Sequence, residues 1–319
     1  MSYQNVGKPK FFIDHGLWLH SLGMSFEYIT QLDHHTKLVQ LNPSQQYISD
    51  GSEYGIIVPR HSPINYVAYL GHNGGNMYPY WYGESGYEVE ITSHINGHSS
   101  PSDFNPQVEY SGFSIFFIND STSAINIGAY ATSSMGAISI GSTYTMPSPN
   151  LSLTMSREYG STNEFTTYNG SSMSNTMNNS APRWGDLGAW ELGSSNPAFS
   201  KSGRRTWQLK FSYMDDGDLF GSNQMLSKHI GNTVTSSDYD DDDLLNNTTF
   251  EYNLLTDDNF FSQVWQKTLG MTLPCILQPD SSNNNPDQFA IVRGVSNSLK
   301  ATQSSPNTYD ISLSIEEVW

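Results

Sequence analysis

Apolar and polar residues alternate with a period of two along most of the chain, which is the pattern of half-buried β-strands. Gly, Asn and Ser residues separate the alternating segments and indicate turns. Short strands at this spacing predict an antiparallel β-sandwich or jelly roll over residues 45–155. Its clearest strand segments are 54–59, 64–73, 87–95, 111–120, 124–131 and 137–147.

The second half of the chain also predicts strands, with longer connections between them. Residues 204–214 (RRTWQLKFSYM) give the most regular alternation, and residues 273–279 and 288–294 are two short apolar runs. The segment 232–250 is the most polar of the chain and predicts an exposed acidic insert. These features predict a second β domain over residues 156–319.

The segment 305–319 predicts a closing strand that is held inside a sheet. Its apolar residues fall on alternate positions, which places them on one face of a strand, whereas the polar residues fall on the other. One face is expected to carry Ile311, Leu313 and Ile315, closed by Val318 or Trp319, and the other Ser312, Ser314 and Glu316.

Helical periodicity is confined to short segments. Residues 258–270 carry an Asp-Asn cap, an amphipathic run of apolar residues and a closing Gly270, so they predict one helix in the second domain. Residues 11–22 predict a short strand that runs into a short helix, within an N-terminal arm over residues 1–44. The sequence therefore predicts a mainly antiparallel all-β protein.

Composition and charge narrow the class of protein. Aromatic residues make up 13% of the chain and charged residues only 14%, which is typical of extracellular or virion β-proteins. The formal charge is -17, with 14 Lys+Arg and no basic run, and this argues against specific nucleic-acid binding. The chain starts without an apolar signal core and has no apolar run long enough to span a membrane. These features suggest a protein that is synthesised in a host cytoplasm and acts outside the cell, as the proteins of a virus particle do.

Chemical motifs are scarce in the sequence. The chain has no G-x-S-x-G elbow, no H-E-x-x-H pair and no phosphate-binding glycine loop, so no catalytic residue is predicted. The single cysteine, Cys275, lies between apolar residues and is expected to be a buried small hydrophobe.

Two groups of residues are candidate metal ligands. The acidic run contains Asp240, Asp241, Asp242 and Asp243, whose carboxylates could bind Ca²⁺, although a solvated acidic loop explains the run more simply. The neighbouring histidines His34 and His35, with His15 and His20, lack the spacing of metal ligands. We therefore predict no metal ion and no cofactor.

An aromatic run over residues 78–82 suggests a sugar-binding surface. Acidic residues lie close to it in the stretch YPYWYGESGYEVE, and a sugar ring can stack on an aromatic side chain. Packing within a strand is the alternative role for these residues, and it is favoured. The candidate glycan contacts are Tyr78, Tyr80, Trp81 and Tyr82.

Several stretches resemble proteins of tailed bacteriophages. The strand INYVAYLGHN (64–73) resembles part of the discoidin-like, galactose-binding jelly-roll modules of phage tail proteins. In the second half, the apolar segment PCILQPD (274–280), the strand FAIVR (289–293) and the ending EVW (317–319) follow a helix. This order is similar to the distal-tail type of tail-tip and baseplate proteins, especially those of marine phages. The acidic insert near 232–250 departs from that pattern.

The resemblance implies a non-enzymatic structural protein of the phage tail. Distal-tail proteins form rings, so we expect a homo-oligomer of three or six copies that docks other tail or baseplate proteins and attaches the particle to its host. Tryptophans are the expected assembly contacts. They are Trp184, Trp190 and Trp319, whereas core packing is favoured for Trp207 and Trp265.

Two other functions are compatible with the sequence. One is a carbohydrate-binding adhesin or receptor-binding protein that contacts host surface glycan through the aromatic run. The other is a polysaccharide depolymerase, which ranks last because the long β-helix repeats usual for phage depolymerases are missing from the chain.

Overall fold

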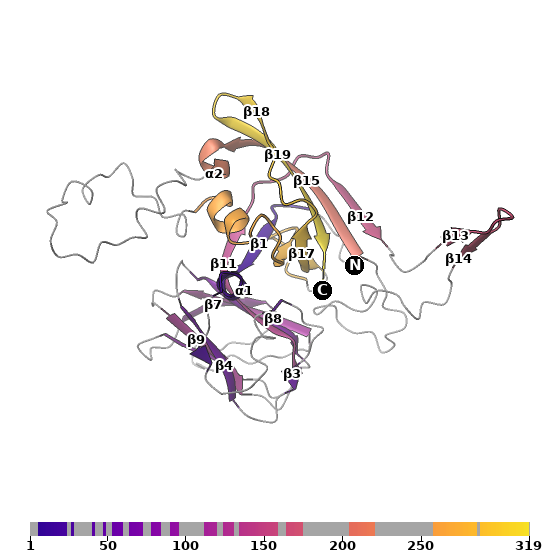
Figure 1. Ribbon diagram of the computed structural model, residues 1–319. Helices are drawn as coiled ribbons and strands as arrows, with labels where there is room; N and C mark the ends of the chain where they lie inside the picture. Colours follow the sequence, from indigo (N-terminus) through magenta and orange to yellow (C-terminus); the bar gives the residue numbers. More distant parts are fainter. Residues whose placement is uncertain are drawn as a thin grey trace.

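The computed structural model describes residues 6–23, 27–28, 40–41, 47–48, 53–59, 64–72, 78–83, 90–95, 112–119, 124–130, 134–158, 164–174, 204–220, 258–285 and 288–318. These residues form a mainly antiparallel β fold with three short helical segments, which confirms the predicted fold class (Figure 1). None of the helices in this part of the chain is long and apolar enough to cross a membrane.

The first half of the chain contributes one helix and eleven strands to the described residues. In chain order they are β1 (Lys10–Asp14), α1 (His15–Ser21), β2 (Glu27–Tyr28), β3 (Tyr47–Ile48), β4 (Glu53–Pro59), β5 (Tyr66–His72), β6 (Tyr78–Gly83), β7 (Glu90–Ile95), β8 (Gly112–Asn119), β9 (Ala124–Tyr130), β10 (Ser134–Met135) and β11 (Ala137–Thr145).

The second half adds the remaining strands and two helical segments. They are β12 (Thr154–Glu158), β13 (Glu164–Thr166), β14 (Ser172–Ser174), β15 (Arg204–Asp215), α2 (Asp216–Phe220), the π-helix η5 (Phe261–Gln266), β16 (Cys275–Gln278), β17 (Ala290–Gly294), β18 (Ala301–Ser305) and β19 (Thr308–Glu317).

One large antiparallel sheet organises the molecule. Its strand order is β12-β15-β19-β17-β16-β1-β11-β5-β8-β7, and β18 also pairs with β19. A second sheet has the order β2-β4-β9-β6 and lies beside the β7–β8 end of the large sheet (Figure 1). The large sheet thus takes strands from all three predicted segments, and their boundaries at 44/45 and 155/156 stay a prediction.

The closing strand lies inside the sheet, between β15 and β17. Ile311, Leu313 and Ile315 are buried, as the alternation predicts. The next inward position belongs to Glu317, which is only 1% exposed and which the sequence analysis did not assign to the buried face. Val318 packs against the edge of the core, and Trp319 lies outside the described residues.

The predicted helix over 258–270 is shorter in the structure. Helical geometry covers the π-helix η5, and the chain then passes through Leu269, Gly270 and Met271, all with positive φ. Three consecutive left-handed residues cannot continue a right-handed helix, and the amide of Gly270 bonds back to the Trp265 carbonyl at 2.8 Å.

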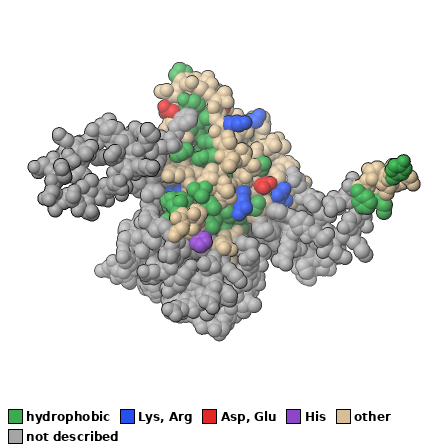
Figure 2. All heavy atoms as spheres, viewed as in Figure 1, with side chains coloured by type: hydrophobic (Ala, Val, Ile, Leu, Met, Phe, Trp, Pro, Cys, Tyr) green, Lys and Arg blue, Asp and Glu red, His purple; other side chains and the backbone are tan. Residues whose placement is uncertain are grey.

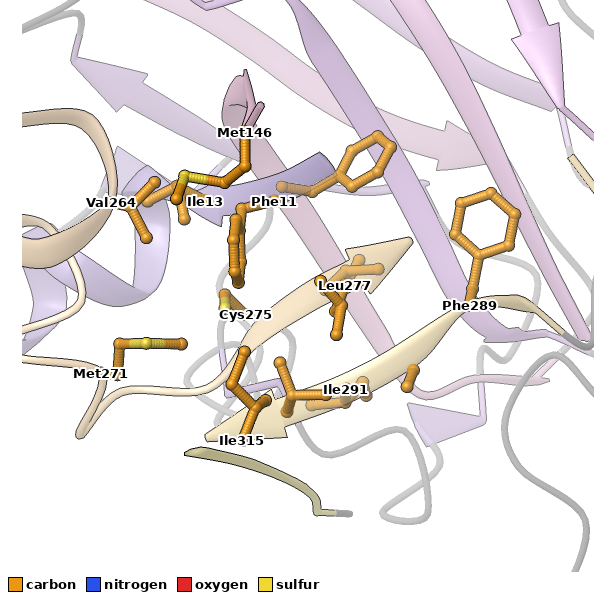
Figure 3. Packing of buried hydrophobic residues seen from close by; sticks show 14 of the residues in the cluster. Phe11, Ile13, Met146, Val264, Met271, Cys275, Leu277, Phe289, Ile291 and Ile315 are labelled. Atoms are coloured by element: carbon orange, nitrogen blue, oxygen red, sulfur yellow. The ribbon is translucent and has the colours of Figure 1, made fainter. Parts of the chain in front are cut away.

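One hydrophobic core connects both halves of the large sheet. Figure 3 shows side chains from β1, η5, β16, β17 and β19 converging, among them Phe11, Val264, Cys275, Ile291 and Ile315. Cys275 is fully buried, as predicted, and burial raises its pKa to about 12. The side chain therefore packs as a small hydrophobe, in the part of the core where the two halves meet.

Candidate functional site

The predicted site residues fall mostly where the structure gives no side chains. Trp184, Trp190, Trp319 and the carboxylates Asp240, Asp241, Asp242 and Asp243 lie outside the described residues, so these assignments stay predictions. Within the described part of the chain, no group of three or more His, Cys, Asp or Glu residues could hold a metal ion. Trp207 is buried and Trp265 packs against the core, which confirms the core role favoured for both.

The candidate glycan residues share one strand. Tyr78, Tyr80, Trp81 and Tyr82 all lie in β6, which is the outermost strand of the four-stranded sheet and pairs with β9. An outermost strand leaves one side of its backbone open to a partner. The backbone alone places these residues, since their side chains are not described.

The most distinctive exposed feature is a hairpin, residues 164–174, which we call the arm. The arm consists of β13, β14 and a tight turn with Gly170 at φ 79°, where the amide of Gly170 donates to the Thr167 carbonyl at 2.9 Å. It stands away from the body of the molecule in Figure 1, and Figure 2 shows hydrophobic side chains on it.

Three large apolar side chains of the arm face solvent. Phe165 and Met173 are cross-strand partners, at 56% and 51% exposure, and Tyr168 at the turn is fully exposed. A two-stranded hairpin is marginally stable by itself, and exposed apolar side chains in one place mark an interaction surface. The sequence analysis missed this surface because three-residue strands give almost no alternation signal.

The arm forms a separate two-stranded sheet, and in the sequence it lies between β12 and β15, two neighbouring strands of the large sheet. The chain leaves the large sheet at Glu158, at the end of the outermost strand β12, and returns at Arg204, which is the direct register partner of Glu158. The arm therefore belongs to an excursion from the sheet edge, where a neighbouring molecule can approach without displacing a strand.

A buried ion pair fastens the closing strand. Arg205 of β15 donates to both carboxylate oxygens of Glu317, from Nε at 3.0 Å and from Nη2 at 2.6 Å, and its backbone amide donates to Oε2 at 2.9 Å. Nη2 also donates to the Phe289 carbonyl at 2.6 Å, and the guanidinium lies 5.5 Å from the centre of the Trp207 ring. One side chain thus ties β15, β19 and the start of β17 together.

A second buried polar group lies where β1 meets β11 and η5. His15 Nε2 lies 3.0 Å from the Ser142 hydroxyl, which donates to Gln263 Oε1 at 3.1 Å, and Lys267 donates to the same oxygen at 2.8 Å. Burial lowers the pKa of Lys267 to about 7. All four residues are buried. The His15–Ser142 contact has the composition of a base and a nucleophile, yet its burial fits a role in holding elements together.

Asp14, beside this group, caps the helix α1. Its Oδ1 accepts from the Leu17 amide at 2.9 Å, and the hydroxyls of Tyr66 and Ser139 bond each other nearby at 2.9 Å. Burial is the main cause that raises the pKa of Asp14 to about 7, against opposing hydrogen bonds that favour the charged form. This carboxyl can therefore gain or lose its proton near neutral pH.

Comparisons with other proteins assign no class to the chain. It matches none of the protein families, none of the curated proteins and none of the solved structures with which we compared it.

Proposed function

We propose that the chain is a structural component of a bacteriophage tail, at the tail tip or baseplate, that assembles with copies of itself into a ring of three or six. In this role it docks neighbouring tail proteins and remains with the virion. The resemblance of the sequence to distal-tail proteins suggested this class, and one structural observation supports it: the arm, a separate two-stranded hairpin with exposed apolar side chains.

The charge of the arm suits contact between copies. Copies of a chain with a formal charge of -17 repel one another, so a contact between them needs a surface of low charge. Of the eleven residues of the arm, only Glu164 carries a formal charge. The arm can therefore approach a second copy without adding to the repulsion.

The size of the arm suggests that each copy needs more than one arm contact. Covering Phe165, Tyr168 and Met173 contributes roughly 3–5 kcal/mol at the usual value for apolar burial. A micromolar complex needs about 8 kcal/mol, so one arm is too weak to hold a dimer. In a ring every copy gives one arm and receives another, so each copy has two arm contacts; a dimer that exchanges arms has the same number, and the mass in solution tells the two apart.

Light scattering over a concentration series tests the proposal. We expect the wild-type chain to form a ring of three or six copies, and the double variant Phe165→Ser/Met173→Ser to need at least tenfold higher concentration. Val295→Ser, which changes an apolar residue of similar exposure outside the arm, is the matched control and should behave as wild type. A wild-type chain that stays monomeric at every concentration, with or without the arm substitutions, would count against the ring.

A carbohydrate-binding adhesin is the second candidate, supported by the four aromatic residues on the outermost strand β6. The full chain is applied to an array of host surface glycans, beside a Tyr80→Ala/Trp81→Ala variant. Binding that this variant loses would support the adhesin. An array without signal for the wild-type chain would leave the ring as the remaining proposal.

A further inference from the structure

The strand β1 is the joint of the large sheet. On one side Lys10–Asp14 pairs with Gly141–Thr145 of β11, and on the other Lys10, Phe11 and Phe12 pair with Gln278, Leu277 and Ile276 of β16. Among the described strands, no other pairing connects the C-terminal group (β12, β15, β19, β17 and β16) to the N-terminal group (β11, β5, β8 and β7). If β1 leaves, the sheet becomes two sheets.

The end of β1 fits closely against β11. A Cβ atom at Gly141 would overlap the Ile13 carbonyl oxygen and come within 2.9 Å of the His15 ring. The backbones of β1 and β11 thus approach to a distance that only glycine permits. Because this contact is so tightly packed, we expect β1 to be either paired with β11 or separated from it, with no stable partly paired state.

The Asp14 carboxyl lies at this joint, and no positively charged side chain is among the groups that shift its pKa. The titratable group that interacts with it is the Tyr66 hydroxyl from β5, and its hydrogen-bonding neighbours are the Ser139 hydroxyl and the Ile140 amide from β11 and the Gly16 and Leu17 amides from α1. His15 bonds Ser142 and belongs to the separate group with Gln263 and Lys267. Asp14 Oδ2 has no hydrogen-bond partner in the described part of the structure. A charged carboxylate in this place lacks most of the hydration that it would have in water.

We propose that β1 and α1 form a latch that opens when the Asp14 carboxyl loses its proton, and that opening separates the two groups of strands along β1. Opening brings water to the carboxylate, which is the stabilisation that the closed site lacks.

The direction of the pH effect follows from the pKa. Burial raises the pKa of Asp14 from its ordinary value of 3.8 to about 7, so the closed latch holds the proton more tightly than the open one. Opening is then favoured tenfold for each pH unit between 3.8 and about 7, and the effect levels off above that range. Between pH 5 and pH 8 the ratio of open to closed rises roughly 100-fold.

Lys267 is the neighbouring group that titrates with the opposite sign. Burial lowers its pKa from 10.5 to about 7, so its neutral form favours the buried state and high pH stabilises it. A comparison with Asp14→Asn removes this contribution, because both proteins keep Lys267. Asn is also a good N-cap, so the substitution preserves the start of α1.

Hydrogen exchange with mass spectrometry tests the latch on the full chain at pH 5 to 8, with rates corrected for intrinsic exchange. In peptides covering residues 10–22 and 137–146, we expect wild-type opening to rise roughly 100-fold relative to Asp14→Asn across this range. Asp310→Asn, a carboxyl on β19 away from the joint, is the matched control and should follow wild type. Peptides from β15 should stay protected.

Two results would overturn the latch. Equal pH profiles for wild type and Asp14→Asn would show that the carboxyl does not govern opening. Equal loss of protection in β15 and β1 would show that Asp14 controls unfolding of the whole chain rather than a joint. If Asp14→Asn fails to fold, Asp14→Ser, which also caps a helix without a charge, replaces it in the same comparison.

Discussion

Replacing Glu317 with Gln should destabilise the protein because it leaves the Arg205 guanidinium buried without a countercharge. Glu317 is 1% exposed and accepts three hydrogen bonds from Arg205, at 2.6, 2.9 and 3.0 Å. Removing one partner of a buried ion pair costs about 3–5 kcal/mol, because the desolvation of the other partner is no longer compensated. For a chain of this size, that loss corresponds to a Tm lower by roughly 4–8 °C.

The neighbouring pair gives a matched control on the same two strands. Arg204 and Glu316 pair across β15 and β19 at 3.3 Å, but on the outward face and in contact with solvent. Glu316→Gln should cost at most about 1 kcal/mol, as is usual for surface ion pairs. The contrast between the two substitutions isolates burial, since the strands and the chemistry are the same.

Urea unfolding followed by tryptophan fluorescence measures both variants, and Trp207 reports directly because it lies beside Arg205. The double variant Arg205→Met/Glu317→Leu should recover most of the loss, because it removes both charges together. A Glu317→Gln cost below 1 kcal/mol, or a double variant no more stable than Glu317→Gln alone, would refute this account of the pair.

Two further predictions concern the joint and the buried amine. Gly141→Ala should destabilise the protein by about 2 kcal/mol or more, because the added methyl group overlaps the Ile13 carbonyl oxygen. A thermal melt should show a lower Tm, and an unchanged Tm would contradict the close approach of the two strands. Lys267→Met should stabilise the protein by up to roughly 4 kcal/mol at pH 6, where the buried amine is charged, and by much less near pH 10, where it is neutral in the folded state. Urea titrations at both pH values measure the difference, and equal effects at the two pH values would contradict a buried, titrating amine.

Local alternation was enough to find most long strands of the fold. The segments 204–214 and 137–147 contain β15 and β11, because both strands bury alternate residues. β18 is not among the predicted strands. Four of its five residues are exposed, so it carries no apolar face; it pairs with β19, and only Ala301 packs against the core.

The alternation of apolar and polar residues could not predict which strands pair when they are far apart in the sequence. The segment 11–22 was expected to form a strand and a helix, and it does, but nothing local shows that β1 lies between β11 and β16. The Arg205–Glu317 ion pair was not predicted for a related reason. Each charged residue is in phase with buried apolar neighbours, and only the register of two distant strands shows that the charges meet.

The candidate site was the least predictable part. Trp207 and Trp265 were correctly assigned to core packing, since both sit in segments of strong apolar pattern. The arm was missed because exposure depends on where the hairpin stands relative to the body, which three-residue strands do not encode.

The central place of β1 also bears on how the chain is made. Lys10 leaves the ribosome early, whereas its partner Gln278 in β16 is synthesised 268 residues later. At 5–20 residues per second, β1 waits roughly 15–50 s with one edge unpaired. During that time the edge is open to other chains, so the nascent protein has a period of aggregation risk that ends only when β16 emerges.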